Sequence, residues 1–180
     1  MKRKVLIVTP HFPPINAVDH QRVRMALPFL EEFGWQPTVL AVSAEQVKGS
    51  RDPLLMGTIP EQIQVVKTGA FSADWLRWIG VSSLAYRALV HLRCVGDAIL
   101  RSEPYDLIFF STTLFPVMAL GPRWRCCVGV PYVLDFQDPW LSDYYEIHPE
   151  PQPPGGRLPQ HHLPPSGQPG AARVRSHHLR

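Results

Sequence analysis

Two aspartates flank a glutamine directly after an apolar run, in the segment PYVLDFQD of residues 131–138. They are Asp135 and Asp138, and an ionised carboxylate in a cleft can accept a proton or a hydrogen bond from a substrate hydroxyl. We interpret both as candidate catalytic residues; the alternative for Asp138 is the cap of a turn, because a proline follows it. Trp140 is a candidate for stacking on a substrate ring, with packing beneath the loop as the alternative.

Polar side chains also gather around the loop that follows the first apolar run, at His11, Asn16, Asp19 and Arg22. The Arg22 guanidinium can hold a phosphate or carboxylate through two parallel hydrogen bonds, or it can be a solvated residue in the first turn of a helix. Asn16 and Asp19 can cap and hydrogen-bond the backbone. His11 is either a substrate contact or a histidine packed in its loop. All four are candidate substrate-binding residues.

Three hydroxyl side chains, Ser111, Thr112 and Thr113, follow a later apolar run. Hydroxyls at the exit of a strand can hydrogen-bond a substrate, or they can cap the helix that comes next. We take Thr112 and Thr113 as candidate substrate-binding residues.

An aromatic and basic region lies in the middle of the chain. Tryptophan and arginine suit contact with an anionic membrane surface, and packing of the two tryptophans in the core is the alternative. The region consists of Trp75, Leu76, Arg77, Trp78, Ile79, Arg87 and Arg93.

Several kinds of site are absent from the sequence. Its three cysteines, Cys94, Cys126 and Cys127, form neither a disulfide framework nor a zinc-ligand spacing, and they favour a reducing compartment. No nucleophile elbow, P-loop or dinucleotide-binding glycine motif occurs. We therefore predict no metal and no cofactor. The net charge of +3 is too small for a dedicated nucleic-acid binder, so no nucleic-acid partner is expected.

Apolar patterning predicts the elements that must position these residues. Continuous aliphatic and β-branched runs predict strands at 4–9, 36–42, 62–67, 105–110 and 131–136. Helical spacing predicts a helix that Asp19 caps and Gly34 ends, with Pro28 inside it, and a second helix over 82–101. We expect residues 43–60 to be irregular, with a short helix as an option, and residues 112–124 to begin as a helix and end as a loop.

This alternation of strands and helices predicts an α/β fold, a Rossmann-like and mostly parallel sheet with helices on both faces. A single domain is expected over residues 1–148. Ligands of such sheets bind where the strands end, so the loops after residues 9, 110 and 136 are expected to share one site. The apolar run of residues 5–8 is too short for a signal peptide, and no stretch reaches the roughly 18–20 apolar residues of a membrane span.

Residues 149–180 have a different composition. They hold eight of the 20 prolines, four glycines, four histidines, four of the 18 lysines and arginines, and one of the 15 acidic residues. This composition leaves too few apolar residues to bury a core, so we predict a disordered tail. Our hypothesis is that the tail is a frameshifted end of the gene; the alternative is a natural disordered linker. The remaining residues, 1–148, are neutral overall.

The opening segment KVLIVTPHFPPINAVDHQRVRMALPFLEEFGWQPTVLAV resembles the N-terminal, acceptor-side domain of GT-B glycosyltransferases, the two-domain, double-Rossmann type, in the retaining group-one or family-four set. The shared features are a first strand, a Phe-Pro-Pro loop, an arginine near the helix start, a helix that ends in glycine, and a PTVL second strand. The later segment GVPYVLDFQDPWLSDYY looks like the same family's strand and cleft loop. The resemblance covers residues 3–148.

Two features depart from the family. Many relatives carry a glycine-rich loop after the first strand, whereas this chain reads INAVD at 15–19. The second Rossmann domain, which binds the nucleotide-sugar donor in this family, is not matched, so the resemblance implies a truncated enzyme.

The resemblance implies transfer of a sugar from a nucleotide-sugar donor to a hydroxyl acceptor, free or lipid-linked, in cell-envelope polysaccharide or glycolipid synthesis. The donor would bind only in a full-length enzyme, and this fragment is expected to be inactive. A cytoplasmic location is expected, with peripheral contact to the inner face of the cell membrane as a further option. The alternatives are a non-catalytic module that binds a carbohydrate or a partner, and a non-functional gene remnant.

Overall fold

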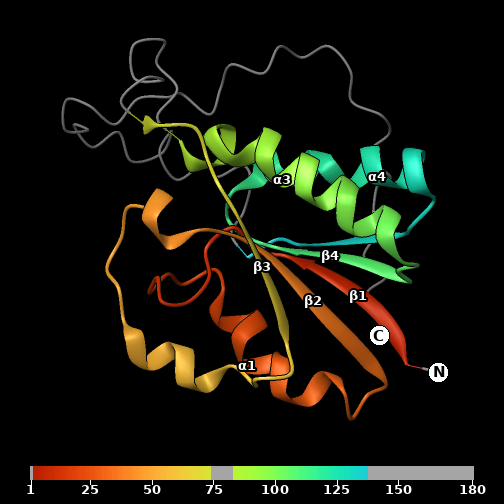
Figure 1. Ribbon diagram of the computed structural model, residues 1–180, viewed down its shortest axis with the longest axis horizontal. Coiled ribbons are helices and arrows are strands. Elements are labelled where there is room, and N and C mark those ends of the chain that lie inside the picture. The colour runs from red at the N-terminus through yellow and green to blue at the C-terminus, as the bar shows by residue number, and fades with distance from the viewer. Residues whose placement is uncertain (1, 74–82, 138–180) are drawn as a thin grey trace, which may run out of the picture. The chain divides into compact units, whose positions relative to one another are not determined.

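The structure is a computed structural model, and it describes residues 2–73 and 83–137 (Figure 1). Its strands are β1 (Arg3–Val8), β2 (Trp35–Val42), β3 (Gln64–Thr68), β4 (Leu107–Ser111) and β5 (Tyr132–Asp135). Its α-helices are α1 (Gln21–Leu30), α3 (Leu84–Ser102) and α4 (Leu120–Val128). Three 3₁₀-helices complete it: η1 (Ala44–Gln46), η2 (Pro53–Thr58) and η3 (Phe115–Ala119).

The strands form one five-stranded sheet in the order β3-β2-β1-β4-β5, and every neighbouring pair is parallel. Helix α1 lies on one face, and α3 and α4 lie on the other (Figure 1). The predicted Rossmann-like α/β fold with helices on both faces is therefore confirmed. Each predicted strand lies within two residues of the observed one. The expected tail, 149–180, lies outside the described residues.

Alternation along β1 divides its side chains between two cores. Leu6 and Val8 pack in the core beneath α3 and α4, whereas Val5 and Ile7 pack beneath α1. Successive side chains of a strand point to opposite faces of the sheet, so a strand covered on both faces must be apolar throughout. This is why the run KVLIV identified the central strand from sequence alone.

The segment after β4 runs in the reverse of the expected order. Residues 112–124 were expected to begin as a helix and end as a loop, but they begin as a turn, pass through η3, and continue as α4 to Val128. Pro116 and Pro122 lie in the first turns of η3 and α4, where the missing N–H has no intrahelical partner to lose. These prolines therefore start the helices. Helix α4 ends at Gly129, whose φ of 75° is left-handed.

The stretch after β2 carries the two short helices η1 and η2, in an otherwise irregular segment as expected. Helix α1 contains Pro28 and is followed by Gly34, which has a φ of 76°. Across residues 2–73 and 83–137, no helix combines the length and the apolar character that crossing a bilayer requires.

Candidate functional site

The carboxyl ends of β1, β4 and β5 bring three loops together, because these strands are adjacent and parallel. Ser111 Oγ donates to Asp135 Oδ2 at 2.8 Å, which joins the ends of β4 and β5. Thr112 Oγ1 donates to Asp19 Oδ2 at 3.3 Å, which joins the β4 exit to the loop after β1. The predicted convergence of the three loops is therefore observed in the contacts.

A histidine–aspartate pair lies in the first of these loops. His11 Nδ1 is 2.9 Å from Asp19 Oδ2. The Asp19 side chain is 3% exposed and the His11 side chain 18% exposed, so the pair runs from the interior to the solvent-accessible surface. A carboxylate only accepts hydrogen bonds, so the proton of the imidazole belongs on Nδ1 and the lone pair on Nε2. The pair has the arrangement of a positioned general base.

The Asp19 carboxyl is held in its ionised form. Burial by itself raises its pKa, but the hydrogen bond and charge of His11, with hydrogen bonds from the Thr113 backbone and the Thr112 hydroxyl, outweigh burial and lower the pKa. Thr113 Oγ1 also lies 3.5 Å from Asp19 Oδ2. The two predicted threonines thus contact the same carboxylate.

Asp19 does not cap helix α1, so this expectation is wrong. The N-cap is His20, and no side-chain hydrogen bond caps the helix. The carboxylate instead faces His11 and the β4 exit, where it gains hydrogen bonds that a helix cap would not provide.

His20 is a buried residue that sequence reasoning missed. Its side chain is fully buried, and its Nε2 lies 2.7 Å from the Ile15 carbonyl oxygen, to which it donates. Burial lowers the His20 pKa, because it disfavours the charged imidazolium more than the Ile15 carbonyl and the Asp19 charge favour it. A neutral His20 therefore holds the loop that carries Asp19. No sequence spacing distinguishes this histidine from a surface one.

Arg22 and Asp135 form an ion pair between the start of α1 and the end of β5. The Asp135 side chain is 13% exposed and the Arg22 side chain 61% exposed, so the guanidinium remains open to solvent on one side. The pair places a cation and an anion side by side at the carboxyl end of the sheet. Asp135 also accepts from Ser111, so both of its oxygens are engaged.

Gln137 links all three loops. Its Nε2 donates to the Asp19 carbonyl oxygen at 2.6 Å and to Ser111 Oγ at 2.8 Å. In the sequence, this glutamine is evident only as the residue between two aspartates. Its position directly after a strand was the available signal, but its partners lie 118 and 26 residues away and depend on the strand order.

The remaining predicted residues divide into two groups. Asn16 is exposed in the loop after β1, and its backbone N–H donates to the Ser50 carbonyl at 2.9 Å. Asp138 and Trp140 lie outside the described residues.

The aromatic and basic region is described only in part, since Trp75, Leu76, Arg77, Trp78 and Ile79 also lie outside the described residues. Arg87 is buried on α3, so its expected place on a basic surface is wrong. Its Nε donates to the Phe71 carbonyl at 2.8 Å and a terminal nitrogen donates to the Gln46 carbonyl at 3.1 Å. Arg87 thus ties two connecting segments to α3, whereas Arg93 is exposed. Within the described ranges, no group of three or more potential metal-ligating side chains comes together.

Comparison with solved structures shows what this fold is similar to. UGT2 of Phytolacca americana, solved with UDP-2-fluoro-glucose and pterostilbene, has a TM-score of 0.54 and 14% identity over 82% of this chain. TcCGT1, solved with UDP, has a TM-score of 0.50 and 12% identity over 82% of this chain. The chain spans 34% and 32% of the lengths of these two proteins. It has a glycosyltransferase-like fold.

No family model matches the sequence, and no curated protein matches it either. At such low identity the structural similarity establishes the fold and leaves the function to the site.

Proposed function

We propose that this chain contains the acceptor-side domain of a glycosyltransferase, which transfers a sugar from a nucleotide-sugar donor to a hydroxyl group. The observation that carries the proposal is the His11–Asp19 pair at the carboxyl end of a parallel sheet with a glycosyltransferase-like fold. A base is needed there, because a hydroxyl is a poor nucleophile until its proton is removed.

The proposed reaction uses the lone pair on His11 Nε2 in a single displacement, which inverts the anomeric carbon, so the proposal departs from the retaining set that the sequence motifs resemble. The imidazole takes the proton of the acceptor hydroxyl as the hydroxyl oxygen bonds to the anomeric carbon of the donor sugar. The bond from that carbon to the nucleoside diphosphate breaks, and its electron pair leaves with the diphosphate. Asp19 holds the imidazole in the required tautomer and stabilises the imidazolium that forms. Thr112 and Thr113 keep Asp19 in place.

Arg22 and Asp135 have a different proposed role. Their ion pair offers a donor and an acceptor within one contact, which suits hydrogen bonds to neighbouring hydroxyls of an acceptor. We propose that Asp135 positions Arg22 and the acceptor, with His11 as the proton acceptor. Asp138 remains a predicted catalytic residue, and Trp140 and Asn16 remain predicted substrate contacts of the same cleft.

The resemblance of the two sequence motifs supports a finer proposal for the acceptor, a saccharide of cell-envelope polysaccharide or glycolipid synthesis, free or lipid-linked. It also supports a protein that acts in the cytoplasm or at the inner face of the cell membrane. Since the chain spans about a third of the structural neighbours, we propose that the donor binds to residues beyond the described domain. Transfer by this chain alone is then expected to be negligible.

The proposal is tested by titrating the chain with methyl glucoside, methyl galactoside and methyl mannoside, which carry sugar hydroxyls and no long apolar group. We expect saturable binding of at least one glycoside, and its loss in Asp19→Asn. His91→Gln, on α3 at the other face of the sheet, is the matched control and should bind as the wild type does. The absence of binding by all three glycosides, or equal binding by Asp19→Asn, would contradict the proposed acceptor site.

A second assay uses UDP-glucose with the same glycosides. No measurable transfer is expected from this chain, whereas robust transfer would contradict the assignment of the donor site to residues beyond the described domain. A non-catalytic carbohydrate-binding module would bind the glycosides as well in His11→Gln as in the wild type, whereas the proposed acceptor site loses its contact with the reacting hydroxyl in this variant.

A further inference from the structure

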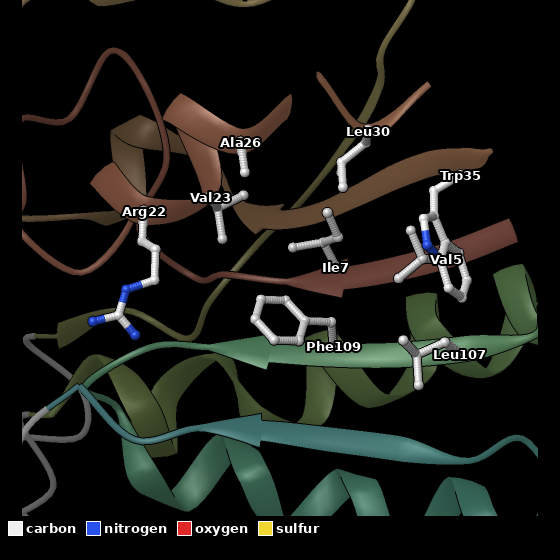
Figure 2. Close-up of a pocket in the computed structure, with 9 residues that line it drawn as sticks. All are labelled: Val5, Ile7, Arg22, Val23, Ala26, Leu30, Trp35, Leu107 and Phe109. Carbon is white, nitrogen blue, oxygen red and sulfur yellow. The ribbon is translucent and has the colours of Figure 1, made fainter. Parts of the chain in front are cut away.

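A narrow apolar slot lies between α1 and the sheet, with a volume of about 280 Å³. Figure 2 shows Val23, Ala26 and Leu30 of the helix above Ile7 of β1 and Phe109 of β4. Aliphatic and aromatic side chains make up nearly all of the lining. A lining of this kind offers few groups to hold water and favours an apolar occupant.

The two ends of the slot differ in character. Trp35 and Leu107 lie at one end, and Arg22 lies at the other (Figure 2). Among the described residues that line the slot, Arg22 alone is charged, and its side chain is 61% exposed. From Arg22 to Leu30 the helix advances by about 12 Å, at roughly 1.5 Å per residue. The slot is therefore elongated and apolar, with a cation at one end.

The ion pair with Asp135 leaves room for an anion at Arg22. The two Asp135 oxygens are already engaged, one by Arg22 and the other by Ser111. A guanidinium has five N–H donors, so donors remain for a second partner on the solvent side. The remaining guanidinium donors can thus hold an anionic group at this end of the slot, and the apolar lining favours an alkyl group along the rest.

We propose that the slot binds a single medium-length alkyl chain with a carboxylate headgroup, that is, a fatty acid. The chain lies between α1 and strands β1 and β4, and the carboxylate contacts Arg22. The slot lies on a face of the sheet, whereas the proposed acceptor site is at its carboxyl end. Arg22 is common to both, but the apolar lining that holds the alkyl chain has no part in the proposed transfer, so the inference goes beyond the proposed function.

The probes are octanoate, octan-1-ol and acetate, titrated calorimetrically into the full chain. Octanoate is expected to saturate at one molecule per chain, and acetate is expected to show no saturable binding. Octan-1-ol is expected to bind about tenfold more weakly, since it keeps the chain and lacks the charge. The proposal would be overturned if acetate bound as octanoate does. It would also be overturned if octanoate binding did not saturate.

Two substitutions locate the site. Ala26 lies at the exposed rim of the slot, so Ala26→Leu fills the slot without crowding the closed core, and octanoate affinity is expected to fall at least about tenfold. Ala98→Leu, at an exposed position of α3, is the matched control and should keep full affinity. Arg22→Gln should bring octanoate down to the affinity of octan-1-ol. Circular dichroism and thermal unfolding establish that each variant is folded.

Unchanged octanoate binding in Ala26→Leu would overturn the proposal, and so would an unchanged preference for octanoate in Arg22→Gln. A second copy of the chain is the competing occupant. If a second copy fills the slot, sedimentation would show a concentration-dependent dimer that Ala26→Leu dissociates but octanoate does not. That result would also overturn the proposal.

Discussion

Asp19 is the residue on which the contacts of the site depend. Its Oδ2 atom accepts from His11, Thr112 and Thr113, and its backbone carbonyl accepts from Gln137. In the described part of the chain, its Oδ1 atom is buried without a protein partner. A buried carboxylate in such a position stabilises the fold only while its donors are present.

Asp19→Asn is expected to lower the free energy of unfolding by about 1–3 kcal/mol, because an amide accepts fewer hydrogen bonds and carries no charge for His11. Urea denaturation at neutral pH measures the change. Glu61→Gln removes an exposed carboxylate and should be close to neutral. Equal stability of Asp19→Asn and the wild type would show that these contacts do not hold the loop.

His20 gives the stability of the protein a pH dependence of defined sign. Its pKa is lowered from the ordinary value of 6.5 by burial, so below that pH the unfolded chain binds a proton that the folded chain does not. The free energy of unfolding is therefore expected to fall between about pH 7 and pH 5.

In His20→Gln the fall over this range should be shallower, and urea titrations at a series of pH values measure it. An identical slope in the variant would contradict the account of His20. The lowered pKa of Asp19 affects stability at a lower pH than His20 does. The ionised Asp19 carboxylate stabilises the fold until the pH falls below the ordinary pKa of this group, 3.8.

At the scale of elements, α3 and α4 pack closely through a glycine. A Cβ atom added to Gly96 would lie 2.3 Å from Trp124 Cζ2. Trp124 is fully buried, and its Nε1 donates to Asp97 Oδ1 at 2.6 Å, so the ring has little freedom to move.

Gly96→Ala is expected to destabilise the fold by about 1–3 kcal/mol through overpacking, although alanine is the better helix former. Gly57→Ala is the control, since a Cβ there meets no atom within 4 Å. Thermal and urea unfolding measure both variants. A Gly96→Ala protein as stable as the wild type would mean that the helices are less closely packed than described.

Strands could be predicted from the sequence because burial on both faces requires unbroken apolar runs such as residues 4–9. The helix after β4 could not, since Pro116 and Pro122 are as compatible with a loop as with the first turn of a helix. The site was predictable as three polar loops at one end of a parallel sheet. The partners of Asp19 and Gln137 were not predictable, because they depend on which strands are neighbours.

At the scale of the whole molecule, the strand order gives the sheet a protected centre and two edges. Strand β1 lies between β2 and β4, and Leu6 and Val8 have no exposed surface. Strand β5 is at an edge of the described sheet, with Val133 46% exposed. Amide hydrogen exchange should therefore be slowest in β1 and clearly faster in β5. Slower exchange in β5 than in β1 would contradict the observed order.

We propose that Asp19 holds His11 with its proton on Nδ1, so that Nε2 can accept a proton from a sugar hydroxyl. The direct measurement is nitrogen NMR of the histidine side chains, with the His11 signals assigned by His11→Gln. We expect the Nδ1–H tautomer in the neutral imidazole, a shift of the Nε2 signal on addition of a methyl glycoside, and loss of both in Asp19→Asn. An Nε2–H tautomer of His11, or an Nε2 signal that no glycoside moves, would contradict the account.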